Sequence, residues 1–255
     1  MAHPGTRGMS GAHPVTLGVI LPDDGPYDYE WLRLEPWLRA NGFGHVSVPV
    51  VRSLADGIMV PEKLRAIGRD TVLVPCAERL RTMGAHAILW ACTTGSFVAG
   101  YEDARGQAAA IARATSLPAT NTSLAMAAAS RALGAGEVDV LGAYTGEVTA
   151  LFVDFLSRSG LRAGRIAALG CVHTRESFEV DIELEISRFT ARHPGRTVPL
   201  LVPDTAINTL ALLKTLVRRA CRPIVTANQA SLWHALEIVG ATGGAGPLAL
   251  FGLAA

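Results

Sequence analysis

The stretch AHAILWACTTGS, residues 85–96, is an apolar run that ends at Cys92 and is followed by two threonines and a glycine. A short apolar run before turn residues is typical of a buried strand. A cysteine between such a strand and the next helix lies where α/β folds place their ligands. Backbone N–H groups of Thr93, Thr94 and Gly95 would face the sulfur and favour its thiolate. The stretch predicts either a reactive thiol or an inert one, since cysteine is often buried.

Strands and helices are expected to alternate along the chain. Besides the strand before Cys92, the pattern predicts strands at 15–21, 45–51, 138–141, 165–169, 197–202 and 223–226. Helices are predicted at 29–40, 61–67, 70–83, 101–115, 123–133, 147–159, 177–193, 207–220 and 231–239. Such alternation implies parallel βαβ units.

A weak internal repeat divides the chain into two halves. In the first half a strand ends at Cys92, a helix follows, and then comes LPATN at residues 117–121. In the second half a strand ends at Asp204, a helix follows, and then comes RPIVT at residues 222–226. Unless this similarity is accidental, two facing lobes would bring Cys92 and Asp204 to opposite sides of one bound molecule.

Composition narrows the classes of function. The 255 residues carry a net charge of +1, and 49% are hydrophobic, which favours a sizeable core. The sequence holds no Lys/Arg run, so nucleic acid is not an expected partner. The cysteines show no CxxC spacing and no secretory leader is recognised, so the cytoplasm is the expected compartment. The longest apolar stretch, residues 85–101, is too short and too polar to cross a membrane.

Neither a metal nor a cofactor is expected from the residue pattern. Asp23 and Asp24 are adjacent carboxylates in a loop, but the sequence offers no further ligand cluster around them. The glycine cluster at 240–246 has no helix after it, so it does not fit a dinucleotide site.

Three motifs give the chain a family resemblance. ACTTGS at 91–96, YTGEV at 144–148 and NQASLWHAL at 228–236 resemble the maleate cis–trans isomerase and arylmalonate decarboxylase branch of the aspartate/glutamate racemase superfamily. The resemblance covers about Val15 to Val239 and implies an α/β fold. It predicts two similar Rossmann-like lobes with parallel four-stranded sheets, related by a pseudo-twofold axis, with the active site in the cleft between them.

The resemblance also implies an organisation for the whole chain. We expect a loose tail over 1–14, a first lobe made of 15–122 and 225–255, and a second lobe over 123–224. The implied partner is a small carboxylate substrate, with no cofactor, no metal and no membrane. Relatives are often dimers or larger, so a homo-oligomer fits the resemblance.

Roles for individual residues follow from the same resemblance. Cys92 matches the first-lobe cysteine, which is the nucleophile in the isomerases. Tyr144 matches a tyrosine that hydrogen-bonds a substrate carboxylate, and Thr93 and Thr205 match positions that hold carboxylate oxygens. Asp204 departs from the family, because it stands where a second cysteine is expected.

Further candidate contacts lie at other strand ends. Thr94 follows the cysteine turn, and Asp24 and Gly25 belong to the loop after the first strand. That loop lacks the asparagine of the isomerases and resembles the decarboxylase loop, yet the decarboxylases carry glycine where this chain has Cys92. His173 follows another strand and is either a plain loop residue or an acid or ligand contact.

Chemistry at a carbon next to a carboxylate needs a group that attacks the carbon or removes its proton, and a group on the opposite face that returns a proton. Cys92 can fill the first role. Asp204 can fill the second only when protonated, which requires a pKa about 3 units above its reference value. An ionised Asp204 would favour a substrate less negative than a dicarboxylate, and a helix N-cap is the alternative role for this residue.

The primary expectation is therefore a cofactor-independent isomerase or racemase of a small carboxylic acid, with Cys92 as nucleophile or base. Three alternatives stay open. These alternatives are a decarboxylase of a substituted malonate, a cysteine hydrolase with His173 as base, and a ligand-binding relative without catalysis.

Overall fold

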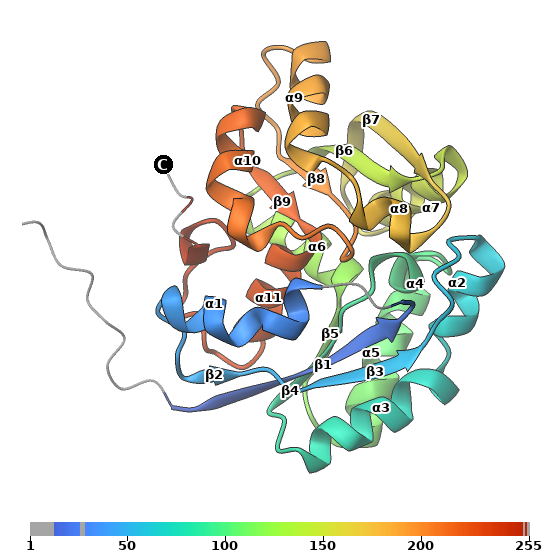
Figure 1. The fold of residues 1–255 in the computed structure, drawn as a ribbon, viewed down its shortest axis with the longest axis vertical. Coiled ribbons are helices and arrows are strands. Elements are labelled where there is room, and N and C mark those ends of the chain that lie inside the picture. Colours follow the sequence, from blue (N-terminus) through green and yellow to red (C-terminus); the bar gives the residue numbers. More distant parts are fainter. Residues whose placement is uncertain (1–12, 26–28, 252, 254–255) are drawn as a thin grey trace, which may run out of the picture.

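The computed structural model describes residues 13–25, 29–251 and 253, so most of the expected tail over 1–14 lies outside the described residues. Figure 1 shows two β-sheets, one below the other, with helices around and between them. The first sheet holds β1 (Val15–Asp23), β2 (Val46–Ser47), β3 (Val50–Leu54), β4 (Ala87–Trp90) and β5 (Ala119–Asn121). The second holds β6 (Glu137–Tyr144), β7 (Arg162–Cys171), β8 (Leu200–Val202) and β9 (Ile224–Thr226).

The helices fall largely where the periodicity predicts them. They are α1 (Leu34–Ala40), α2 (Pro61–Ile67), α3 (Asp70–Thr82), α4 (Thr93–Phe97), α5 (Tyr101–Thr115), α6 (Thr122–Ala132), α7 (Gly146–Arg158), α8 (Thr174–Phe178), α9 (Ile182–Arg192), α10 (Leu213–Ala220) and α11 (Ala227–Glu237). The predicted helices over 29–40 and 207–220 are shorter and begin with 3-10 turns at Glu30–Arg33 and Leu210–Leu212. Among the described residues, none of the helices is long and apolar enough to cross a membrane.

Both sheets are parallel, as expected. The second sheet has four strands in the order β7-β6-β8-β9, and the first has five strands. The strand predicted over 45–51 is wrong, because it is split into β2 and β3, which pair with successive parts of the same edge of β1. Pro49 lies at the split and has no N–H to donate to a ladder. The first sheet therefore has four strand positions, one of which two short strands share.

The first sheet is buried on both faces. In β1, Leu17, Val19 and Leu21 belong to a core with α1 and α11, whereas Ile20 belongs to the core under α3. This alternation follows from the period of two in a strand, since successive side chains point to opposite faces. A strand buried on both faces reads as a continuous apolar run, which is why 85–91 is so hydrophobic.

The two halves repeat the same sequence of elements around a pair of central helices. Asn121 ends β5 and caps α6, and Thr226 ends β9 and caps α11. Helices α6 and α11 pack against each other between the sheets, and the Ser231 hydroxyl donates to the Thr122 hydroxyl at 3.0 Å. The order of features in the internal repeat thus corresponds to equivalent structural units. The lobe boundaries given above stay a prediction.

A strap joins the two halves beside the strand ends. Residues 55–60, after β3, contact the loop after β7: the Met59 N–H donates to the Val172 carbonyl at 2.9 Å, and the Thr174 N–H donates to the Gly57 carbonyl at 2.8 Å. Gly57 has φ +76°, and a Cβ there would lie 2.7 Å from the His173 ring. Only glycine fits both the backbone and the close approach.

Gly57→Ala is expected to destabilise the protein by about 2 kcal/mol or more, because it adds a collision to the cost of a positive φ. Gly84→Ala is the matched control, since Gly84 has φ +82° but nothing within 4 Å of a Cβ. Urea unfolding of both variants measures the difference. Equal losses of stability would show that the strap tolerates the methyl group.

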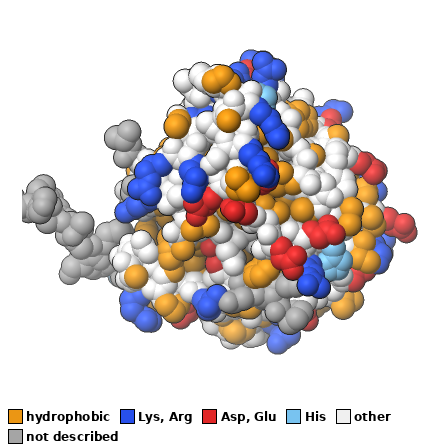
Figure 2. All heavy atoms as spheres, turned by 45° about the horizontal axis from the view of Figure 1, so that its top comes forward, with side chains coloured by type: hydrophobic (Ala, Val, Ile, Leu, Met, Phe, Trp, Pro, Cys, Tyr) orange, Lys and Arg blue, Asp and Glu red, His pale blue; other side chains and the backbone are white. Residues whose placement is uncertain are grey.

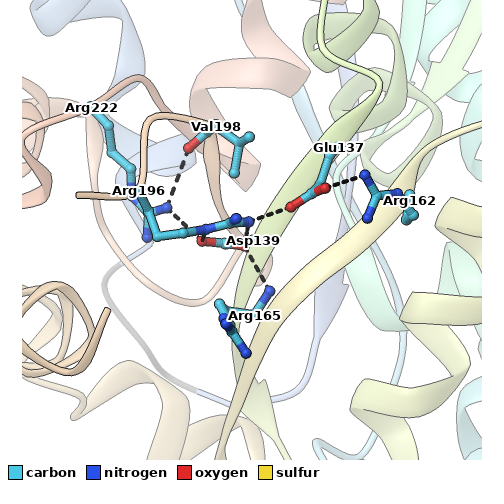
Figure 3. A network of polar contacts seen from close by, with 7 residues as sticks. All are labelled: Glu137, Asp139, Arg162, Arg165, Arg196, Val198 and Arg222. Atoms are coloured by element: carbon cyan, nitrogen blue, oxygen red, sulfur yellow. Dashed lines mark hydrogen bonds and ion pairs between the residues drawn. The ribbon is translucent and has the colours of Figure 1, made fainter. Parts of the chain in front are cut away.

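A network of charges ties the second sheet together at the edge where β6 begins (Figure 3). The fully buried Asp139 carboxylate accepts from Arg196 Nη2 at 2.6 Å, from Arg222 Nη1 at 2.5 Å and from the Arg165 N–H at 2.7 Å. Burial works against ionisation of Asp139, but these donors outweigh it and hold its pKa below the ordinary value. Glu137 extends the network by pairing with Arg196 and with an exposed arginine of β7.

The surface carries mixed charge. On the face in Figure 2, Lys and Arg side chains are interspersed with Asp and Glu side chains and with scattered hydrophobic ones. This pattern agrees with the net charge of +1. The face offers no broad surface of one sign.

Candidate active site

Two small adjoining pockets lie where strand ends of the two sheets face each other. Both are lined by Pro22, Asp24, Met59, Cys92, Thr94 and Thr174. Asp204 and Thr205, which follow β8, line one of them. Cys92 follows β4, so side chains from the two different sheets contribute to the same site. The cleft expected between the lobes therefore corresponds to a small pocket at the carboxyl ends of the strands.

Cys92 stands at the N-terminus of α4 and is only 4% exposed. The Gly95 N–H points to the sulfur, and a Cβ on Gly95 would lie 3.1 Å from Sγ and 2.8 Å from the Trp90 ring. Burial nevertheless raises the pKa of the thiol to about 12, and Asp24 and Asp204 act in the same direction. Of the two states that the sequence leaves open, the protonated thiol is therefore favoured, because desolvation exceeds the opposing effects of the Gly95 N–H and the Thr94 side chain. At neutral pH Cys92 is a neutral thiol.

Asp204 is buried and has φ +139°, a region that is almost reserved for glycine. Its Oδ1 accepts the Ala206 N–H at 2.9 Å, whereas Oδ2 has no partner among the described residues. Burial raises its pKa to about 6, with Asp24 adding to the shift. The shift has the direction that the sequence argument requires for a proton donor, but the ionised form of Asp204 still predominates at neutral pH. The helix N-cap role is wrong, because the next helical turn begins only at Leu210.

Asn228 holds the strained Asp204 loop in place. Its Nδ2 donates to the carbonyls of Thr205 at 3.2 Å and Ile207 at 3.1 Å. Its Oδ1 accepts the Trp31 indole N–H at 2.8 Å, which links the loop to the other half of the chain. The NQASLWHAL motif, which the sequence identifies only by resemblance, thus begins with a residue that fixes the loop carrying Asp204.

Buried hydroxyls gather behind the pocket wall. Among the described residues, the Thr93, Tyr144 and Ser177 hydroxyls make no hydrogen bond of good geometry, although Thr93 lies close enough to Tyr144, and Ser177 to Asp204, to lower the pKa of that neighbour. Tyr144 is fully buried and does not line the pockets, but burial, Asp204 and Cys92 all raise its pKa, so it stays a neutral donor. Unsatisfied buried polar groups are uncommon and need a water or ligand nearby. The hydroxyls therefore mark the polar side of the site.

Ser177 is a residue that the sequence does not reveal. It lies on α8, is fully buried and lowers the pKa of Asp204 against the effect of burial. No motif distinguishes it from any other helical serine. Ser177 comes close to Asp204 only because α8 packs at the end of β7.

The remaining candidates divide into residues that reach the pocket and residues that do not. Asp24, Thr94 and Thr205 line it. His173 does not, since its Nδ1 accepts the Arg175 N–H at 3.1 Å and caps α8. Gly25 also lies outside the lining, and its carbonyl accepts from an arginine of β3. An imidazole beside the Cys92 sulfur, which a cysteine hydrolase needs, is not among the residues that line either pocket.

An apolar wall completes the site. Pro22, Met59, Leu64 and Ile67 line one pocket on the side of α2. The sequence predicts α2 but gives no sign that it faces the pocket. Over the part of the chain that the structure describes, no group of three His, Cys, Asp or Glu side chains is arranged to hold a metal ion.

The chain matches known proteins over most of its length. The family model of arylmalonate decarboxylase matches residues 50–248. An arylmalonate decarboxylase from Bordetella bronchiseptica is 27% identical over 241 residues, which cover 91% of this chain and 93% of the relative.

Two solved structures extend the comparison. A liganded mutant of arylmalonate decarboxylase, with one glycine replaced by cysteine and one cysteine by serine, has a TM-score of 0.76, is 26% identical and covers 91% of this chain and 94% of its own. The maleate isomerase from Pseudomonas putida S16 has a TM-score of 0.80 at 19% identity, covering 89% of this chain and 94% of its own, and shares the fold. The resemblance to this branch and its two-sheet fold are confirmed.

Proposed function

Because the chain belongs to the arylmalonate decarboxylase family, we propose that it is a cofactor-independent racemase of a small carboxylic acid. The observation that carries the proposal is that Cys92 and Asp204, which follow strands of different sheets, line the same pocket. A racemase needs two proton-transfer groups on opposite faces of one carbon. The relatives support carboxylate chemistry of this general kind, either isomerisation or decarboxylation.

The two groups differ in their proton affinity. At neutral pH, Asp204 is ionised and can accept the proton from the carbon next to the substrate carboxylate. Cys92 holds its proton and can give it to the opposite face of the resulting enediolate. One turnover leaves Asp204 protonated and Cys92 as thiolate, and proton exchange with solvent restores both. Addition of a Cys92 thiolate to a double bond, as in a cis–trans isomerisation, is less favoured because the thiolate is scarce.

The enediolate needs donors to stabilise its negative charge. Thr94 and Thr205 line the pocket and can donate to its oxygens. The Tyr144 and Thr93 hydroxyls lie near each other behind the wall, and the raised pKa of Tyr144 keeps its proton in place. All of these groups are neutral donors that act without any cofactor.

Decarboxylation of a substituted malonate is the second candidate. The family match favours it, and the neutral Cys92 thiol suits a group that protonates the enediolate after carbon dioxide leaves. The pocket carboxylates Asp24 and Asp204 count against it, because they repel a malonate dianion in a desolvated site.

Proton NMR in heavy water separates the two reactions. The protein is incubated with a panel of single enantiomers of small 2-substituted carboxylic acids and with matched 2-substituted malonates. Racemisation puts a solvent deuteron into the enantiomer that forms, while recovered starting material keeps its proton. Loss of carbon dioxide from malonates, with no exchange in any monocarboxylate, would reject the racemase in favour of the decarboxylase.

Asp204→Asn is expected to lower racemisation by about a hundredfold and to remove its acid limb. In the unaltered protein, kcat/KM falls below about pH 6, because protonation of Asp204 removes the base. The measurement is chiral chromatography from pH 5 to 9 on this variant and on Asp154→Asn, an exposed control on α7. Decarboxylation would respond in the opposite way, since losing a negative charge favours a dianionic substrate.

A further inference from the structure

We propose that the substrate carries a positively charged amino group, which the Asp24 carboxylate binds, so that the protein acts on a small apolar α-amino acid. This inference rests on the proposed racemase function and adds the substrate class to it. It comes from the charges and shape of the pocket.

The Asp24 carboxylate is held in a fixed position in the site. It follows β1 directly, it lines both adjoining pockets, and its Oδ1 accepts the Tyr29 hydroxyl at 2.7 Å. Thr174 also hydrogen-bonds it from the pocket wall. Burial raises the pKa of Asp24 above its ordinary value, while these donors fix the carboxylate and limit that rise. Asp24 acts electrostatically on both Cys92 and Asp204, so the three groups surround one small space.

The pocket has an excess of negative charge. Of the lining residues that the structure describes, Asp24, Asp56 and Asp204 are negative and Lys63 is the one cation. Lys63 pairs with Asp56, and both side chains are about half exposed at the mouth. Arg52, outside the lining, is held by Asp23 at 2.9 Å and by the Gly25 carbonyl at 3.3 Å. Among the described residues, Asp24 and Asp204 therefore have no cation in the lining, and Arg52 acts on Asp24 only from outside it.

A zwitterion fits this arrangement better than a plain carboxylate. Its ammonium group offsets the charge of Asp24, and its carboxylate lies toward the hydroxyls of Thr94 and Thr205. The carbon between them then lies within reach of Cys92 and Asp204. The ammonium group also withdraws electrons from that carbon and makes its proton easier to remove.

The side chain of the substrate, which is the third substituent on the reacting carbon, has a defined place in the pocket. The wall formed by Met59, Leu64 and Ile67 is apolar, and it can take an aliphatic or thioether side chain. A charged side chain would lose its hydration there without a partner. The inferred substrate is therefore a small amino acid with an apolar side chain.

The experiment uses sets of compounds with one carbon skeleton. Leucine, 2-hydroxy-4-methylpentanoate and 2,4-dimethylpentanoate, each as single enantiomers, are followed by chiral chromatography and by deuterium incorporation in heavy water. Calorimetry gives the dissociation constant of each compound. We expect leucine, or the shorter alanine and valine, to be racemised and to bind about tenfold or more tightly than the analogues without nitrogen.

Asp24→Asn and Asp23→Asn are the matched pair. Asp23 is the neighbouring carboxylate, but it faces solvent with 64% of its side chain exposed. Asp24→Asn is expected to weaken amino acid binding about tenfold or more, whereas binding of the anionic hydroxy acid should stay the same or become tighter, because a repelling charge is lost. Asp23→Asn should change neither. Asp24→Glu keeps the charge and is expected to keep the preference for the amino compound, which separates loss of charge from damage to the fold.

The outcomes distinguish this inference from the function on which it rests. Racemisation of 2-alkyl or 2-hydroxy acids in preference to amino acids, unaffected by Asp24→Asn, would overturn the ammonium site and leave the racemase standing. Exchange in none of the compounds, together with amino acid binding that depends on Asp24, would support the site and contradict the racemase. Amino acid binding that is as tight in Asp24→Asn as in Asp23→Asn would overturn the inference directly.

Discussion

Cys92→Ala is expected to lower racemisation by about a thousandfold or more, which makes it the most damaging change to activity in this chain. Alanine has no proton to return, so the enediolate formed by Asp204 can be reprotonated only from the face that it left. Slow deuterium incorporation without inversion should therefore survive in the variant. Chiral chromatography and NMR in heavy water, applied to the same sample, measure inversion and exchange separately.

The controls for this variant come from the other cysteines. Cys221 is exposed after α10, and Cys76 lies on α3 away from the pocket lining, so alanine at either position should leave the rate within about twofold. Cys92→Ser replaces the thiol with a hydroxyl of similar size, which is a much weaker acid. Racemisation that survives Cys92→Ala within tenfold would show that another group gives the proton.

Much of this site could be predicted from the chain because strand ends are visible in a sequence. The apolar run before Cys92 and the repeat that pairs it with Asp204 depend on local patterns, and the structure brings both residues to one pocket. The protonation states depend on burial, which is a property of the packed molecule. This is why the local argument gives a low pKa for Cys92 and the fold gives a high one.

Other features need contacts between distant parts of the chain. Ser177 and Met59 belong to ordinary helical or loop sequence, and only the packing of α8 and of the strap near β4 brings them to the site. The strained φ of Asp204 has no signal either, because aspartate follows proline in many plain turns. Its backbone is held by Asn228, which lies 24 residues further along the chain.

The family resemblance predicts a second thiol at position 204, and the carboxylate of Asp204 implies a different division of labour in the site. Two equivalent thiols would take and give protons with similar ease in either direction. Here Asp204, with a pKa of about 6, and Cys92, with a pKa of about 12, favour opposite protonation states at neutral pH. The substrate enantiomer whose proton faces Asp204 is therefore expected to react with the enzyme in its resting protonation state.

Arg222→Met is expected to be the most damaging single change to stability, at about 3 kcal/mol or more. Arg222 and Asp139 have 1% and 0% of their side chains exposed, so removal of the cation leaves a buried carboxylate with fewer partners. Arg196 and the Arg165 N–H still bind Asp139, which limits the loss. For a chain of this size, the melting temperature should fall by roughly 6–12 °C.

Arg219→Met is the matched control. Arg219 pairs with Glu183 at 2.8 Å on the exposed face of α10, so its replacement should lower the free energy of unfolding by at most about 1 kcal/mol. Two nitrogen atoms of Arg222 have no partner among the described residues, so the guanidinium is itself only partly satisfied, although it lies over the Phe189 ring at 5.5 Å. A loss as small as that of Arg219→Met would mean that methionine packing replaces what the ion pair supplies.

Racemisation per folded molecule should be unchanged in Arg222→Met, because Asp139 precedes Tyr144 by five positions of β6, roughly 17 Å along the strand. The charged network therefore holds the second sheet together from the end opposite the pocket, so its loss should affect unfolding without altering the chemistry.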